Sequence, residues 1–558
     1  MSISNPNLPK SILAFRAYTS NLFLHDLLAG ITVGLVALPL AMAFGIASGV
    51  TPQAGLYTAV VAGFLISALG GSRTQIGGPT GAVVVIVAGI VARFGMSGLA
   101  MVTLMAGIIL LAMGLTGLGS AVRFIPRMVV IGFTNGIAVL IASTQIKDFF
   151  GLRTGPVPSE FLPRMKMLAE HFATLTPAAL GLGLGTLAIL LLLPRITRRV
   201  PASIVAVVVC TAICWLFHLP VETIGSKFGG IPRGLPPFAI PDFHAEHILP
   251  LIPSAFTVAL LAALESMLSA VVADGMTGDR HNSNVELVAQ GIANIVSPLF
   301  GGIPATGAIA RTATNIRAGG RTPVSGMVAA LTLLLILLVA APLASYIPLA
   351  TLAAVLFVVA YRMGEWQEIG AILQMDLTAI SVWLVTFSLT VFADLTVAVA
   401  VGMSLAALLY IYRIAETTTV SPVTDEYIRD GLPHVLQGRI LPPYVTLLRI
   451  HGPFLFGTTE KLVEATVNLE AFSAVVILRL RNMTAIDATG IHAIETFAVR
   501  LHESGRTMLL CGAMQQPSKL LSGPRFLDRV GRENIMPNIQ AALDRAKQIH
   551  AEQGAIAS

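Results

Sequence analysis

Two glycine- and proline-rich motifs occur far apart in the sequence, each at the start of an apolar stretch. The first is Gly77-Gly-Pro-Thr-Gly-Ala82, and the second is Gly301-Gly-Ile-Pro-Ala-Thr-Gly-Ala308. Because glycine and proline prevent a helix from continuing, each motif predicts a helix that begins anew at that point. The first amides of a helix lack partners, and its N-terminus carries roughly half a positive charge. Two such ends facing each other predict a site for a small anion, whereas the alternative is a pair of ordinary helix kinks.

Three polar side chains lie within apolar stretches of the chain or beside them. Glu265 lies deep in an apolar run, and Ser269 follows one helical turn later on the same face. Burying a carboxylate in a membrane helix costs at least about 2.5 kcal/mol, so we expect Glu265 to face a cavity and to be protonated or paired. We assign Glu265 and Ser269 a role in ion coupling. Arg311 is expected to add positive charge near the anion; the alternative is an anchor that snorkels to the cytoplasmic side.

The composition requires a membrane around most of the chain. Hydrophobic residues make up 55% of the 558 residues and charged residues only 11%, whereas soluble proteins carry about 25% charged residues. The charge-free runs predict fourteen membrane segments, of which those near 76–92 and 303–316 are short. We expect the longest runs to divide at 48–53 and 341–348. Fourteen segments form seven plus seven, so the two motifs open the third segment of each half, and the halves have opposite orientation.

The positive charges of the short loops predict the orientation. If residues 1–24 lie in the cytoplasm, the short inner loops contain arginine and the short outer loops contain neither lysine nor arginine. We therefore expect a multi-pass protein of the inner (plasma) membrane, with a transport domain at 25–415 and both termini in the cytoplasm. The net charge of +6 then reflects these loops, and no nucleic-acid partner is expected.

Several other functions have no support in the sequence. The pair His244 and His247 lacks a third metal ligand, so we expect no metal site. A phosphate-binding Gly-x-x-x-x-Gly-Lys motif does not occur, which disfavours an ATP-driven pump. The core contains no nucleophile–base pair, so we expect neither an enzyme nor a cofactor.

The C-terminal part of the chain has a different pattern. Residues 416–443 are polar and proline-rich and predict a linker, while short β runs alternate with amphipathic helices over 444–558. This α/β region contains Val475-Val-Ile-Leu-Arg-Leu480 followed by Ile486-Asp-Ala-Thr-Gly490, and it resembles a STAS domain. The resemblance implies that Thr489 occupies the position of a phosphorylatable hydroxyl; the alternative is that Thr489 only caps the following helix.

The membrane segments carry a second resemblance. The motifs Leu38-Pro-Leu-Ala-Met-Ala-Phe-Gly45, Gly78-Pro-Thr-Gly81 and Pro304–Asn315, together with the STAS-like tail, are similar to the SulP anion permeases of solute-carrier family 26. This similarity implies a moving core bundle (segments 1–4 and 8–11), a gate bundle (segments 5–7 and 12–14) and a homodimer. It also implies a substrate site formed by Phe44, Thr80, Gly81, Gly307, Ala308 and Ile309.

The chain departs from the sodium-coupled bicarbonate members of that family, which carry Asp at Glu265, Thr at Ser269 and Thr at Ile309. The missing hydroxyl at Ile309 removes a sodium ligand, and a carboxylate without good co-ligands is better suited to carry a proton. The resulting prediction is a proton-coupled secondary transporter of sulfate, bicarbonate or a small dicarboxylate, with an elevator-type mechanism. The alternatives are an uncoupled anion channel, a nucleobase permease of the same fold, and a membrane-anchored signalling protein.

Overall fold

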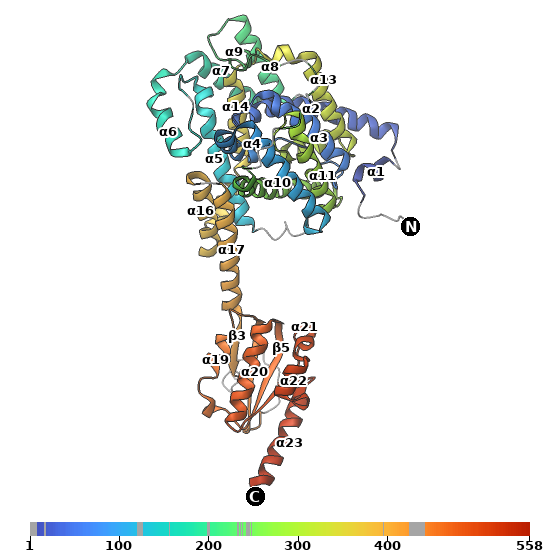
Figure 1. The fold of residues 1–558 in the computed structure, drawn as a ribbon, viewed down its shortest axis with the longest axis vertical. Coiled ribbons are helices and arrows are strands. Elements are labelled where there is room, and N and C mark those ends of the chain that lie inside the picture. Colours follow the sequence, from blue (N-terminus) through green and yellow to red (C-terminus); the bar gives the residue numbers. More distant parts are fainter. Residues whose placement is uncertain are drawn as a thin grey trace. The chain divides into compact units, whose positions relative to one another are not determined.

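The computed structural model describes residues 8–15, 18–119, 126–155, 157–197, 201–231, 234, 236, 238–241, 246, 248–393, 395–422 and 441–557. The chain divides into two compact units, Met1–Ser404 and Leu405–Ser558 (Figure 1). Most of the predicted linker 416–443 lies outside the described residues, so its prediction is tested only at its two ends.

The first unit is helical. Its helices are α1 (Lys10–Phe15), α2 (Ser20–Ala47), α3 (Pro52–Leu69), α4 (Gly81–Leu115), α5 (Arg127–Phe150), α6 (Phe161–Glu170), α7 (Pro177–Ile196), α8 (Ala202–Leu216), α9 (Ile224–Phe228), α10 (Ile248–Thr277), α11 (Ser283–Val296), α12 (Ile309–Arg317), α13 (Val324–Ala344), α14 (Leu349–Met363), α15 (Trp366–Ile372) and α16 (Leu377–Phe392); α17 (Leu395–Thr417) extends into the second unit. In the described ranges, nine helices are long and apolar enough to cross a membrane, and α8 and α16 are shorter apolar helices.

The predicted breaks in the longest apolar runs are confirmed. Helix α2 ends at Ala47 and α3 begins at Pro52, while α13 ends at Ala344 and α14 begins at Leu349. The third and tenth segments are also broken. Helix α12 has nine residues, about 14 Å at 1.5 Å per residue, which is half of a bilayer core of about 30 Å. Helix α4 is interrupted at Gly95, where φ is 67° and ψ is −167°.

Helices of the two halves of this unit pack against each other in corresponding pairs. Helix α2 of the first half packs on α13 of the second half, and α10 of the second half packs on α4 of the first. Glycines allow close approaches between the halves: a Cβ on Gly34 of α2 would lie 2.9 Å from the carbonyl oxygen of Ala329 of α13, and one on Gly107 of α4 would lie 2.8 Å from that of Gly291 of α11. This reciprocal pairing agrees with a repeat of seven segments, whereas the total of fourteen remains a prediction.

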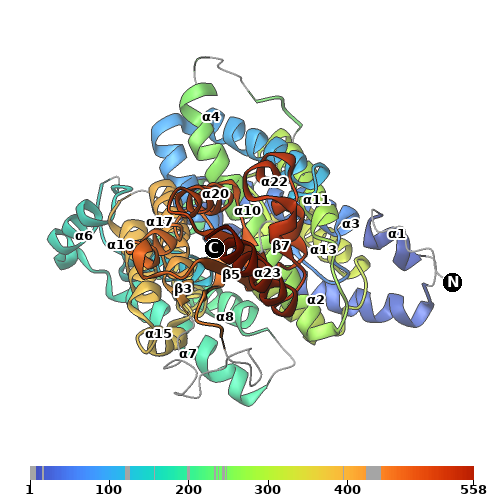
Figure 2. The same cartoon turned by 90° about the horizontal axis from the view of Figure 1, so that it is seen from below.

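The helices of the first unit form two bundles. In one, α2, α3, α4, α10, α11, α12 and α13 pack on one another; in the other, α5 packs on α14 and α16, and α7 packs on α8 and α14. Figures 1 and 2 show α3 and α13 on the opposite side of this unit from α6 and α16. We name the first group the core bundle and the second the gate bundle.

The second unit is a five-stranded sheet with helices on both faces. The strands are β3 (Thr419–Pro422), β4 (Val445–Phe454), β5 (Val475–Ile486), β6 (Thr507–Cys511) and β7 (Ile535–Met536), in that spatial order; β3 pairs antiparallel, and the other pairs are parallel. The helices are α19 (Glu460–Ala465), α20 (Ala488–Glu503), α21 (Gln515–Leu521), α22 (Pro524–Val530) and α23 (Ile539–Ala557). Helices α20 and α22 contribute to the apolar core on one face, and α23 to that on the other. The α/β prediction is therefore confirmed, but β3 occupies part of the predicted linker because pairing with β4 orders this short segment.

Candidate anion-binding site

The two glycine- and proline-rich motifs meet in the core bundle. Strand β1 (Gly77–Gly78) pairs antiparallel with β2 (Thr306–Gly307), with Gly77 opposite Gly307 and Gly78 opposite Thr306. Helix α4 begins at Gly81 and α12 at Ile309, so both helices begin within three residues of this two-stranded pair. Gly78 has a φ of +140°, a conformation that a residue with a side chain rarely adopts. The predicted convergence of the two helix starts is therefore present.

Buried side chains satisfy the irregular backbone around this crossing. The hydroxyl of Ser266 in α10 accepts a hydrogen bond from the Gly307 amide at 2.9 Å. The hydroxyl of Thr312 in α12 accepts one from the Ile76 amide at 3.0 Å, and the Ala308 amide donates to the Ile76 carbonyl at 2.8 Å. Extended backbone can exist at membrane depth only when protein groups satisfy it in this way.

The first turns of the two half-helices lack capping side chains. Thr80 and Ala308 occupy the N-cap positions, and neither side chain bonds to an amide of its own helix. The Thr80 hydroxyl instead forms a 2.9 Å hydrogen bond with the hydroxyl of Thr306. The amides of Gly81 and Ile309, the first helical residues, therefore have no capping side chain, as a receptor for an anion requires.

Both bundles contribute side chains around the start of α4. A Cβ on Gly81 would lie 3.5 Å from Cε1 of Phe44 in the core bundle. It would lie 3.1 Å from Cδ1 of Ile141 and 3.4 Å from Sδ of Met363, both in the gate bundle. The structure thus brings Phe44 to the predicted site. Ile141 and Met363 gave no signal in the sequence because they are apolar residues inside apolar runs.

Arg311 is buried at the crossing of the two motifs. Its side chain is only 3% exposed, and Nη2 donates a hydrogen bond to the carbonyl oxygen of Pro79. A Cβ on Gly78 would lie 2.8 Å from Nη1. The guanidinium of α12 is therefore next to the backbone that opens α4. The snorkelling alternative is wrong in this structure, while contact of Arg311 with an anion remains a prediction.

Glu265 and Ser269 have different surroundings. Glu265 lines a narrow pocket with Phe133 and Thr134 of α5 and Val399 of α17, and no side chain in the described ranges forms a hydrogen bond or ion pair with it. Ser269 is fully buried, and its hydroxyl bonds to that of Thr312 at 2.9 Å. The two side chains lie one helical turn apart on the same face of α10 but have different neighbours, and the coupling role assigned to them remains a prediction. Helix α5 lies near Glu265, and helix α12 lies near Ser269.

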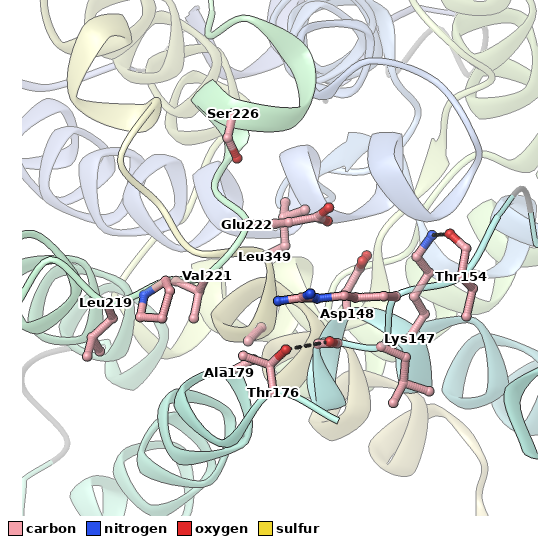
Figure 3. Close-up of a pocket in the computed structure, with 15 residues that line it drawn as sticks. Lys147, Asp148, Thr154, Thr176, Ala179, Leu219, Val221, Glu222, Ser226 and Leu349 are labelled. Carbon is pink, nitrogen blue, oxygen red and sulfur yellow. Dashed lines mark hydrogen bonds between the residues drawn. The ribbon is translucent and has the colours of Figure 1, made fainter. Parts of the chain in front are cut away.

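A larger pocket of about 700 Å³ lies elsewhere in the first unit (Figure 3). Its lining includes Lys147 and Asp148 of α5, and Glu222. Lys147 donates to the Thr154 carbonyl at 3.3 Å, and Asp148 pairs with Lys227 at 3.2 Å. None of the predicted site residues lines this pocket, and these polar side chains already have partners within the protein. It is therefore a weaker candidate for the anion site.

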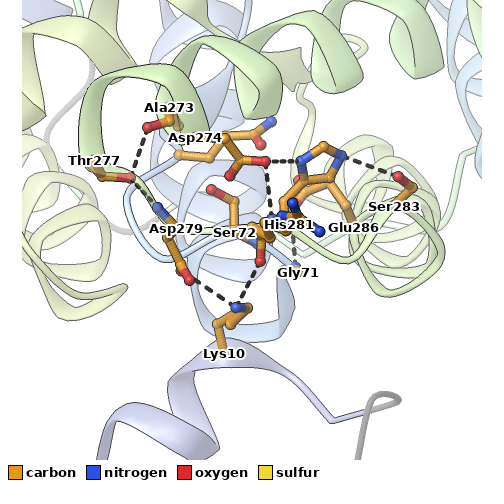
Figure 4. Close-up of polar contacts among 12 residues, drawn as sticks. Lys10, Gly71, Ser72, Ala273, Asp274, Thr277, Asp279, His281, Ser283 and Glu286 are labelled. Carbon is orange, nitrogen blue, oxygen red and sulfur yellow. Dashed lines mark hydrogen bonds and ion pairs between the residues drawn. The ribbon is translucent and has the colours of Figure 1, made fainter. Parts of the chain in front are cut away.

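A polar cluster joins the ends of α10 and α11 (Figure 4). The His281 ring contacts the Asp274 carboxylate at 2.7 Å and the Ser283 hydroxyl at 3.0 Å. The Glu286 carboxylate accepts a hydrogen bond from the Gly71 amide at 2.9 Å, which attaches α11 to the segment after α3. The sequence analysis did not identify this cluster. Its groups bond to one another, which gives it a role in holding the core bundle together.

Thr489 is exposed in the first turn of α20. The helix is capped by Asp487, whose Oδ1 accepts from the Gly490 amide at 2.8 Å; its Oδ2 accepts from the Phe456 amide at 3.0 Å. The interpretation of Thr489 as the cap is therefore wrong, because the carboxylate two residues earlier occupies that position. The Thr489 hydroxyl is not used for capping, and its regulatory role remains a prediction.

Comparison with known protein families agrees with this architecture. Residues 23–386 match the sulfate permease family, and residues 440–545 match the STAS domain. The chain is similar to a putative sulfate transporter, YvdB, of Bacillus subtilis, with 40% identity over 93% of this chain and 97% of the relative. It is also similar to the bicarbonate transporter BicA of Picosynechococcus, with 31% identity over 93% of this chain and 94% of the relative.

A solved structure supports the fold. The murine anion transporter Slc26a9 superposes with a TM-score of 0.86 at 20% identity, covering 97% of this chain and 94% of that one. The similarity therefore includes both the helical unit and the C-terminal sheet. The chain belongs to the sulfate permease family, whose members are multi-pass membrane transporters and not enzymes, and it carries a C-terminal STAS domain.

Proposed function

We propose that this protein is a secondary active transporter that moves sulfate, bicarbonate or a small dicarboxylate across the inner (plasma) membrane. The observation that carries the proposal is the meeting of two half-helix N-termini, at Gly81 and Ile309, beside one backbone crossing. Together they offer roughly one unit of positive charge and several free amides. The sulfate and bicarbonate transporters among its relatives support this class of substrate.

The position of the site supports an elevator-type movement. Gly81 lies between Phe44 of the core bundle and Ile141 and Met363 of the gate bundle. A displacement of the core bundle along the gate bundle would therefore move the half-helix starts past a fixed apolar wall. We further propose that the protein acts as a homodimer with both termini in the cytoplasm, the orientation that the arginines of the short inner loops favour.

The surroundings of Glu265 favour a proton over sodium as the coupling ion. Sodium prefers several oxygen ligands, but the Ser269 hydroxyl is engaged with Thr312, and Ile309 offers no hydroxyl. Glu265 instead faces a pocket with an apolar lining that includes Phe133 and Val399. A carboxylate in such a place favours its neutral form, so it can take up a proton on one side and release it on the other.

Uptake into proteoliposomes tests the function. Purified protein would be supplied with labelled sulfate, bicarbonate, fumarate or chloride, with and without an inward proton gradient, and empty liposomes would serve as the control. We expect saturable uptake of at least one oxyanion, with accumulation only when the gradient is present. Voltage-driven flux without coupling would instead identify an anion channel, and uptake of uracil but no anion would identify a nucleobase permease.

A further inference from the structure

Three arginines lie near one another on two neighbouring strands of the C-terminal sheet. Arg449 of β4 lies directly opposite Arg479 of β5, which in turn lies opposite Cys511 of β6. Arg481 follows two residues after Arg479, and a Cβ on Gly512 would lie 3.6 Å from the Cβ of Arg481. The charges of Arg449 and Arg481 both act on the Arg479 guanidinium. This arginine row therefore concentrates positive charge at one place in the sheet.

Arg479 is the unusual member of the arginine row. Its side chain is 93% buried, being only 7% exposed, and no residue in the described part of the chain forms a hydrogen bond or ion pair with its guanidinium. Arg481 is exposed and likewise has no carboxylate partner among the described residues. Burial lowers the pKa of Arg479, Cys511 opposes that shift, and the neighbouring arginines add to it. Buried charges in proteins are normally paired, so an anion would supply the partner that the Arg479 guanidinium lacks among the described residues.

The arginine row lies level with the carboxyl ends of β6 and β7, whereas β4 and β5 continue beyond it. Strands β4, β5 and β6 are parallel, and Arg479 and Cys511 pair toward the carboxyl end of β6. Helix α23 begins at Ile539, three residues after Met536, which pairs with Cys511. The N-terminus of α23 is therefore close to the same edge and adds to the positive field. Ligands of open α/β sheets bind at the carboxyl ends of the strands.

We propose that this edge of the C-terminal sheet binds a doubly charged oxyanion, either free sulfate or a phosphate group, held by Arg479 and Arg481. Two planar guanidinium groups can each offer a pair of N–H donors to a tetrahedral oxyanion. Arg449 contributes its charge, and the site does not depend on any free donor from it. This site lies in a different unit of the chain from the half-helix starts, so the proposal does not rest on the proposed transport function.

Hydrogen–deuterium exchange of the full-length protein tests the proposal. The protein would be held in nanodiscs of zwitterionic lipid, with sulfate, inorganic phosphate or chloride at equal ionic strength. We expect sulfate or phosphate to slow exchange in peptides that cover 475–490 and 507–516. In Arg479→Gln the apparent affinity should fall about tenfold, as expected for the loss of charge-assisted hydrogen bonds. Arg525→Gln, an exposed position on α22 under the opposite face, is the matched control.

The design separates this proposal from the transport function, because exchange is read peptide by peptide. Absence of slowed exchange in these peptides, or equal slowing in Arg479→Gln, would overturn the proposal even if transport is normal. If Arg479→Gln does not fold, the exposed position Arg481→Gln replaces it with the same expected loss. Nanodiscs with anionic phosphatidylglycerol and no added oxyanion form a further arm: slowed exchange there supports the site and identifies a lipid phosphate as its ligand.

Discussion

At the scale of single residues, Glu265 is the group that we propose as the proton carrier. It lines a pocket next to Phe133 and has no hydrogen-bond partner among the described residues. Glu265→Gln keeps the shape of the side chain and removes the exchangeable proton. We expect this variant to lose proton-driven accumulation while anion exchange continues, measured as counterflow in proteoliposomes. Glu170→Gln, an exposed position at the end of α6, is the control, and undiminished acid-stimulated uptake would exclude Glu265 as the proton carrier.

Arg311 permits a separate test of the anion site. Its guanidinium bonds to Pro79, directly before the N-cap of α4. Arg311→Ala removes this bond and a full positive charge, so we expect the affinity for the transported anion to fall by about tenfold or more. Arg311→Lys, which keeps the charge, should retain most of the affinity. Equilibrium binding of radiolabelled sulfate measures both, with Arg317→Ala at the exposed end of the same helix as control; unchanged affinity in Arg311→Ala would place it outside the site.

Cys511 gives a prediction about pH in the second unit. Burial raises the pKa of its thiol to about 11, and the Arg479 charge opposes the shift only in part. A raised pKa in an acid keeps the neutral thiol dominant to higher pH, so the folded protein should hold about a hundredfold less thiolate at pH 8 than an exposed cysteine. Alkylation followed by mass spectrometry should show Cys511 reacting only near pH 11 in the native protein. Half-maximal labelling near pH 9 without unfolding would contradict this.

At the scale of elements, two hydroxyls position the half-helices. Ser266 of α10 accepts the Gly307 amide, and Thr312 of α12 accepts the Ile76 amide. Because Ser266 is fully buried, Ser266→Ala would leave a buried amide without a partner, at a cost of about 1–3 kcal/mol. We expect a lower melting temperature in detergent and slower transport. Thr314→Ala serves as control because that exposed hydroxyl bonds only to Ala310 within α12; equal stability of both variants would argue against this role of Ser266.

The elements differ in how far the sequence predicts them, for a physical reason. Breaks at Gly81 and Ile309 follow from local backbone chemistry, because glycine and proline end helices wherever they occur. The bond between Ser269 and Thr312, in contrast, joins residues 43 positions apart, and helix periodicity alone grouped Ser269 with Glu265. Contacts of this kind depend on how distant segments of the chain come together, and the pairing of β3 with β4 does too. The position of the site was therefore predictable, and the partners of several of its residues were not.

At the scale of the whole molecule, the repeat explains why the site exists. Helices α2 and α13 pack together as α10 and α4 do, so each half completes the bundle of the other. With the two halves in the expected opposite orientation, the chain of each half reaches the shared crossing of β1 and β2 from its own side, and its half-helix begins there. The proposed anion site is thus formed by the pairing between halves, and neither half contains it alone.

The same organisation predicts which part of the chain binds the anion. All residues assigned to the half-helix site, from Phe44 to Arg311, lie within Met1–Ser404. Deleting residues 441–558 should remove the oxyanion site proposed for the C-terminal sheet but leave the affinity of the half-helix site for labelled sulfate unchanged within about threefold, which is roughly 0.7 kcal/mol. Full-length Arg311→Ala provides a control with weakened binding, and size-exclusion chromatography shows whether the shortened protein remains monodisperse. A monodisperse shortened protein that no longer binds sulfate would mean that the C-terminal domain is needed for recognition, as in a signalling protein anchored in the membrane.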